Sequence, residues 1–171
     1  EFSFALIFLG GDRSHYGEMQ YELPDNVTHL ECHYLMDPQT FEKPAPRKGN
    51  PDAFRAQREL HDCFKTRKEI PTDLLNRVFR DLGATGGISR RDFLHSEQSW
   101  EMIDESYRKY STDPSFVDYF WTVRIMHAPL FQLADIASSM PGVRVLHSIS
   151  TGYAGILGAM ASDRRGIPLV L

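Results

Sequence analysis

The sequence predicts an α/β fold in which a parallel sheet is interrupted by a helical region, and three observations lead to this prediction. Apolar runs at 4–9 and 143–146 have the length and composition of buried strands. The second run is followed by a helical pattern and a further apolar run at 167–171. Helical patterns fill most of the chain between 52 and 138. We therefore expect a Rossmann-like sheet with a helical insertion between its second and third strands.

The first part of the chain contains the first two predicted strands. Phe4 to Leu9 is predicted to be a fully buried strand that ends in a tight turn at Gly10-Gly11-Asp12. The turn signal at Pro24-Asp25-Asn26 introduces 27–34, which alternates with period two and is typical of an outer strand of the sheet. The proline-rich stretch from Pro38 to Pro51 is predicted to be an irregular surface loop.

The predicted insertion consists of helices separated by breakers. One helix is expected over 52–68 and a second from Pro71 to Leu82, before the glycine-rich breaker at 83–87. After a short segment that opens at 89–93, a further helix should begin at Ser96 or Glu97 and continue to Tyr107 or Tyr110.

An aromatic helix is expected from Phe116 onwards, capped by Asp113-Pro114 with Ser115. Pro129 should kink or restart it, because proline removes a backbone donor inside a helix. One face is predicted to carry Phe116, Phe120, Val123, His127 and Leu130. Arg124 lies beside Trp121 in this helix, and two interpretations of it are open. Its side chain would either bind a ligand or form a buried ion pair with Asp92, Asp118 or Asp135.

The last part of the chain predicts a strand–helix–strand unit. The strand 143–146 ends in a polar tip at 147–152, and a helix follows until Gly166 and Pro168 stop it. Apolar residues at helical spacing should form its core stripe: Tyr153, Ile156, Leu157 and Met160. Small residues should let another element approach closely: Gly155, Ala159 and Ser162.

The polar tip is the first candidate for a binding site, because ligands of open α/β sheets bind at the carboxyl ends of strands, beside helix N-termini. The candidate residues are His147, Ser148, Ser150, Thr151, Gly152 and Tyr153. Gly10, Gly11, Asp12 and Arg124 are candidates for lining a cleft. For His147 the alternative is a structural role, in which the imidazole bonds to the backbone at the end of a strand.

Other polar clusters favour structural interpretations. His29 and His33 should face one side of their strand and Cys32 the other, so these residues are not expected to bind one metal ion. Glu97, Glu101 and Glu105 are expected on a solvated helix face. The glycines at 10 and 11 match neither a dinucleotide-binding fingerprint nor a phosphate loop.

Composition narrows the class of protein. The chain has 171 residues, of which 42% are hydrophobic and 25% charged, as in an ordinary globular domain. A net charge of −4 gives no reason to expect nucleic acid as a partner. Two cysteines without a disulfide framework, and no apolar run of membrane-spanning length, favour the cytoplasm. Because apolar strands lie at both ends, we expect residues 1–171 to be one domain cut from a larger protein.

The sequence also resembles a known family over most of its length. The resemblance is carried by His147 to Gly155 with Arg165 to Leu171, by Asp92-Phe93-Leu94, and by Ser115 to Arg124. Phe4 to Gly10 and Leu23 to Val27 add to it. These runs are similar to the N-terminal domain of PelF-type glycosyltransferases, retaining family-4 enzymes of bacterial exopolysaccharide synthesis.

The resemblance implies a GT-B architecture, in which the active site lies between two Rossmann-like domains. This chain would be the acceptor-side domain, with His147, Ser148 and Ser150 contacting sugar hydroxyls. Its partners would be a C-terminal nucleotide-sugar-binding domain of the same chain, a saccharide acceptor and a membrane-associated polysaccharide synthesis complex. The donor would be a UDP-sugar, with neither a metal nor a further cofactor, and the fragment alone would be inactive. Many family-4 enzymes have His-x-His at this tip, whereas the second position here is Ile149.

The residues leave two other functions to consider. A stand-alone α/β ligand-binding or regulatory module would bind without turnover. A small nucleotide-binding enzyme is disfavoured, because the sequence has no complete phosphate loop.

Overall fold

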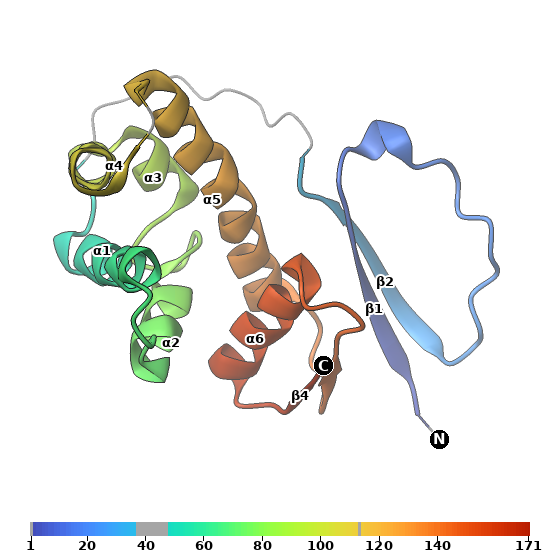
Figure 1. Cartoon of the computed structure of the whole chain (residues 1–171). Coiled ribbons are helices and arrows are strands. Elements are labelled where there is room, and N and C mark those ends of the chain that lie inside the picture. The colour runs from blue at the N-terminus through green and yellow to red at the C-terminus, as the bar shows by residue number, and fades with distance from the viewer. Residues whose placement is uncertain (1, 37–47, 113) are drawn as a thin grey trace.

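A computed structural model describes residues 2–36, 48–112 and 114–171 of the chain, and Figure 1 shows its arrangement. The order of elements is strand, strand, helices, strand, helix, strand, as the sequence predicts. The expected cap residue Asp113 and most of the predicted loop from Pro38 to Pro51 lie outside the described residues.

The N-terminal strands form a parallel pair. β1 (Phe4–Gly10) pairs with β2 (Val27–Tyr34), and the long connection between them contains the 3-10 helix η1 (Arg13–His15). The prediction that β1 is fully buried is wrong. Phe4 is 50% exposed, and Leu6 and Phe8 are 39% exposed. The physical reason is that this face of β1 is not covered by a helix, and the pair stands beside the helical part of the molecule (Figure 1).

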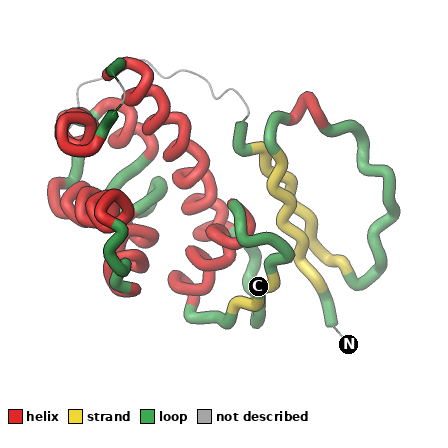
Figure 2. Tube along the Cα trace, in the orientation of Figure 1, coloured by secondary structure: helices red, strands yellow, loops and turns green. Residues whose placement is uncertain are grey.

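Helices α1 to α4 cover the chain from 51 to 110. Their bounds are α1 (Pro51–Thr66), α2 (Thr72–Asp81), α3 (Arg90–His95) and α4 (Glu97–Tyr110). Local caps explain several of the ends. The Asn50 side chain accepts bonds from the first turn of α1, and Ser89 forms a reciprocal capping box with Asp92 at the start of α3. Figure 2 shows how densely helices fill this part of the molecule.

The aromatic segment is one long helix, α5 (Phe116–Ser139), with Ser115 as its N-cap as predicted. The helix runs through Pro129, so the alternative of a restart there is wrong. Proline leaves the carbonyl of Ile125 without its usual partner. Because Ile125 lies on the exposed side of α5, water can reach that region, while Pro129 itself is buried.

The helical core contains an unpredicted pair of histidines. The Nε2 atoms of His61 on α1 and His127 on α5 lie 2.9 Å apart, and the His127 ring stacks on Phe93. The Nδ1–H of His127 donates to the carbonyl oxygen of Val123 over 2.7 Å. Burial lowers the pKa of both imidazoles, to about 4 for His61, where the nearby His127 adds to the effect.

The C-terminal unit is the predicted parallel strand–helix–strand. β3 (Leu146–His147) and β4 (Leu169–Val170) pair in parallel, and α6 (Tyr153–Arg165) connects them and ends at the left-handed Gly166. Leu157 and Met160 are buried as expected, whereas Tyr153 is 36% exposed because it lies in the first turn, beyond the packed part of α6. The main helix partner of α6 is α5.

The fold is therefore mixed α/β, but the described residues do not form one continuous sheet. β1 pairs only with β2, and β3 only with β4. The expected single sheet is wrong for these residues because β3 and β4 pair over only two residues each, and neither strand reaches β1 or β2. In the described part of the chain, none of the helices is long and apolar enough to cross a lipid bilayer.

Candidate functional site

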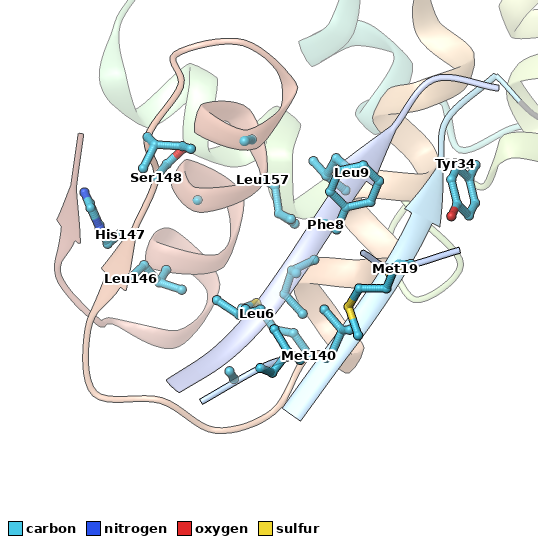
Figure 3. A pocket seen from close by; sticks show the side chains of 18 of the residues that line it. Leu6, Phe8, Leu9, Met19, Tyr34, Met140, Leu146, His147, Ser148 and Leu157 are labelled. Atoms are coloured by element: carbon cyan, nitrogen blue, oxygen red, sulfur yellow. The ribbon is translucent and has the colours of Figure 1, made fainter. Parts of the chain in front are cut away.

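A cavity of about 930 Å³ lies between the two strand pairs (Figure 3). β1 contributes Leu6 and Phe8, α6 contributes Leu157, and the segment after η1 contributes Met19. Most of the lining is apolar. Polar groups enter it from the segment at and after η1, with His15, Glu18 and Gln20, and where β3 ends, with His147 and Ser148.

His147 stands at the carboxyl end of β3, and its side chain is exposed at the rim of this cavity. Within the described parts of the chain, its imidazole makes no hydrogen bond. The structural alternative required a bond to the backbone, so the geometry favours a side chain that is available to a ligand. Ile149 is 94% exposed and does not contribute a second polar group.

The two serines of the loop have an internal role. The buried Ser148 hydroxyl donates to the carbonyl oxygen of Ser150 over 2.7 Å and accepts the Ser150 N–H at 3.4 Å. The Ser150 hydroxyl in turn accepts the Gly152 N–H at 3.3 Å. These short-range bonds hold the loop in a turn.

The first turn of α6 offers unused backbone donors. Its N-cap is Gly152, which has no side chain to cap the helix, and Thr151 and Tyr153 are exposed beside it. The first bond of the helix runs from Ile156 N–H to the Gly152 carbonyl. The N–H groups of Tyr153, Ala154 and Gly155 therefore have no partner within the helix, and the partial positive charge of a helix N-terminus suits an oxygen-rich or anionic ligand.

Glycines fix the loop against α6. A Cβ atom added at Gly155 would lie 2.9 Å from the carbonyl oxygen of Ser150, and one at Gly158 would lie 2.8 Å from the side chain of Leu169. The small residues of this helix therefore allow the close approach that the sequence predicts, by the loop at Gly155 and by β4 at Gly158.

The cleft-lining candidates at the end of β1 are occupied by local contacts. A Cβ at Gly10 would meet the rings of Tyr16 and Tyr34 at 2.9 Å, and Gly11 N–H donates to the Tyr16 hydroxyl. The Asp12 carboxylate accepts bonds from the Ser14 N–H and hydroxyl, which lower its pKa. Gly10, Gly11 and Asp12 do not line the cavity described above.

Arg124 lies on α5, outside the lining of that cavity. Its guanidinium is 4.9 Å from the centre of the Phe120 ring and 5.5 Å from that of Trp121. The ion pairs of the described residues do not join it to Asp92, Asp118 or Asp135, so the structure does not support the ion-pair interpretation of Arg124. Its contacts are cation–π contacts.

The other polar clusters are engaged by local contacts or exposed to solvent. Both oxygens of Glu31 are engaged by histidines of the same strand face, His29 at 2.7 Å and His33 at 2.9 Å, which lowers the pKa of Glu31. Cys32 does not join them. In the described ranges, His, Cys, Asp and Glu side chains do not gather in a group that could hold a metal ion. The face with Glu97, Glu101 and Glu105 is exposed.

The sequence analysis missed a pair of arginine clamps at the end of α6. Arg164 donates to the carbonyl oxygens of Phe79 and Leu82 at 2.8 and 2.7 Å, and also contacts the Ser138 hydroxyl. Arg165 donates to the carbonyls of Ser138, Pro141 and Met140 near the end of α5. Both arginines therefore satisfy free carbonyls at the ends of α2 and α5.

Comparison with known protein families matches residues 1–171 to the family described as "Domain of unknown function (DUF3492)". No curated protein and no solved structure matches the chain.

Proposed function

This chain belongs to the DUF3492 family, and we propose that it is the acceptor-side domain of a retaining, GT-B type glycosyltransferase that builds an exopolysaccharide. One observation carries the proposal. The exposed imidazole of His147 and the uncapped N-terminus of α6 lie together at the carboxyl end of a parallel strand, at the rim of a cavity. The resemblance of this loop and of the aromatic helix to PelF-type enzymes gives the reaction class.

In the proposed reaction, the role of this domain would be to position the acceptor. In a retaining transfer from a UDP-sugar, the leaving diphosphate can accept the proton of the acceptor hydroxyl as the new glycosidic bond forms. A second domain would hold the nucleotide sugar. His147 would bond to a sugar hydroxyl, and the N–H groups of α6 would face oxygen atoms across the cleft.

The alternative is a binding or regulatory module without turnover, and the same tip residues would serve it. A reducing compartment such as the cytoplasm suits either function, since Cys32 and Cys63 are free thiols. The two functions differ in one measurable respect, which is release of UDP from a UDP-sugar in the presence of an acceptor.

Replacing His147 tests the site in a polypeptide that joins this domain to its nucleotide-sugar-binding partner. A hydrogen bond contributes about 0.5–3 kcal/mol, depending on the charge of its partner. His147→Ala should therefore lower kcat/KM by roughly 2- to 150-fold at unchanged melting temperature, because the side chain is exposed and has no hydrogen bond to lose within the described chain. Kinetics and thermal unfolding are measured on the same samples.

Ser148→Ala serves as the matched comparison. Its hydroxyl is buried and holds the loop, so this variant should lower the melting temperature. Normal kinetics together with a lower melting temperature in His147→Ala would assign the histidine to structure and remove the site. Absence of UDP release from any UDP-sugar by the wild-type two-domain protein would favour the module without turnover.

A further inference from the structure

The edge of β1 that faces away from β2 has no partner. Phe4 N–H donates to the Asn26 carbonyl and the Gly10 carbonyl accepts from Leu35 N–H, so these even-numbered residues direct their backbone groups towards β2. Backbone groups of successive residues in a strand point to opposite sides. The N–H and C=O groups on the other edge belong to Ala5, Ile7 and Leu9. Within the described chain, these groups are not hydrogen-bonded to another backbone segment.

β3 has a free edge of the same kind. Leu146 N–H donates to the Pro168 carbonyl and Ser148 N–H to the Val170 carbonyl, both over 2.9 Å, so these residues face β4. The groups on the opposite edge belong to Val145, His147 and Ile149. They too lack a backbone partner among the described residues.

The two free edges border the same cavity. Every residue from 5 to 9 and from 145 to 149 lines it. Consecutive residues point to opposite faces of a strand, so a cavity that touches all of them meets the edge of the strand rather than one face. By contrast, β2 contributes only alternate residues, Leu30, Cys32 and Tyr34. The small residues Ala154, Gly158 and Ala161 of α6 also line the space.

We propose that this cavity is a slot for one further β-strand, an extended apolar polypeptide segment from outside residues 1–171 that pairs with β1 and β3 together. The added strand would join both pairs into one sheet, with α6 packed across it. Parallel strands are normally buried on both faces and occur in larger sheets, and isolated two-stranded sheets are only marginally stable. Leu6 and Phe8, each 39% exposed, would gain neighbours.

Backbone chemistry distinguishes this occupant from an apolar small molecule. A lipid or another apolar ligand could fill the volume, but it would cover the N–H and C=O groups of both edges without giving them partners, which is costly. An extended peptide satisfies both edges and has apolar side chains for both faces. The slot includes the first part of the polar tip, His147 to Ile149, whereas Ser150 and Gly152 lie outside its lining. The slot is inferred from backbone groups alone and does not depend on the chemistry proposed for the tip.

Hydrogen exchange on the 171-residue chain tests the slot. The probe is a synthetic peptide as long as β1, built of alternating isoleucine and valine with flanking lysines. Bound in the slot, it should slow exchange of the Ile7, Leu9 and His147 amides by at least about tenfold, because each gains a hydrogen-bonding partner. The matched control is the same peptide N-methylated at alternate residues, which keeps its apolar character but cannot pair along one edge. It should protect one set of amides at most.

A variant pair tests the same geometry in the protein. Ile7→Pro removes an N–H that faces the slot, and it should abolish protection by the peptide while β1 and β2 stay paired. Leu6→Pro removes a donor to β2 and should unfold the pair. If Ile7→Pro does not fold, the comparison between the unmodified and the N-methylated peptide on the wild-type chain tests the proposal.

Three results with the peptides would overturn the proposal: protection on only one edge by the unmodified peptide, equal protection by the N-methylated peptide, or no protection at millimolar peptide. Protection that rises with protein concentration in the absence of peptide would assign the slot to a second copy of the chain, and would overturn it as well.

Discussion

Two buried imidazoles make the stability of this domain sensitive to pH at the scale of single residues. His61 and His127 are paired across α1 and α5, and burial keeps both neutral at pH 7. The folded pKa of His61 is about 4, below its ordinary value of 6.5. The unfolded chain therefore takes up a proton first as the pH falls, and the stabilisation is present above pH 6.5 and lost between 6.5 and about 4.

The expected loss from His61 is up to about 3 kcal/mol in the free energy of unfolding, because one pKa unit corresponds to about 1.4 kcal/mol. Urea unfolding at a series of pH values checks it. His61→Gln should weaken the dependence of the free energy of unfolding on pH between 6.5 and about 4. Replacing the exposed His15 by glutamine should leave that dependence unchanged. An identical slope in wild type and His61→Gln would contradict the assignment.

Glycine spacing at the start of α6 gives a second prediction at this scale. A Cβ at Gly155 meets the backbone carbonyl of Ser150, whereas one at Gly158 meets the flexible end of Leu169. Alanine is intrinsically better than glycine in a helix by about 1 kcal/mol. Gly158→Ala should therefore be close to neutral, while Gly155→Ala should be destabilising and displace the loop at 147–152. Thermal unfolding and the amide chemical shifts of the loop measure both effects, and equal behaviour of the two variants would contradict the close contact.

At the scale of elements, α6 is attached to the helical region through its last turn. The Arg164 guanidinium bridges the carbonyls at the end of α2 and the Ser138 hydroxyl of α5. Planar, multiple hydrogen bonding of this kind is specific to arginine. This contact ties the strand–helix–strand unit, and with it the candidate loop, to the rest of the fold.

Arg164→Ala should lower the free energy of unfolding by about 2–3 kcal/mol, since hydrogen bonds to a charged group are worth about 1.5–3 kcal/mol. Arg164→Lys should recover only part of the loss. The control is Arg80→Ala, which breaks the exposed ion pair with Asp163 and should cost less than about 1 kcal/mol. Urea unfolding measures all three variants, and an equal loss in Arg164→Ala and Arg80→Ala would contradict the clamp.

At the scale of the whole molecule, the proposed reaction needs two domains. In that proposal, the loop at 147–152 would hold the acceptor, and the donor would bind to the second domain. The isolated 171-residue domain should therefore release no UDP when it is incubated with a panel of UDP-sugars and a saccharide acceptor. A coupled assay for UDP, compared with a heat-killed sample, measures this. Turnover above that control would show that one domain suffices and would contradict the two-domain proposal.

The sequence by itself determined the local structure of this protein. The apolar run of β1, the alternation of β2, the Ser115 cap of α5 and the stop of α6 at Gly166 all follow from neighbouring residues, because strand patterns and helix caps act over a few positions. The position of His147 at a strand tip before a helix was predictable for the same reason.

The tertiary structure alone decided which distant groups meet. The partner of each strand edge, the contact of His61 with His127 and the carbonyls that Arg164 reaches depend on residues dozens of positions away. Local patterns do not encode such pairings, since the same apolar strand can be a covered centre or an exposed edge. That is why β1 was predicted to be buried within one sheet and is instead half-exposed beside a cavity.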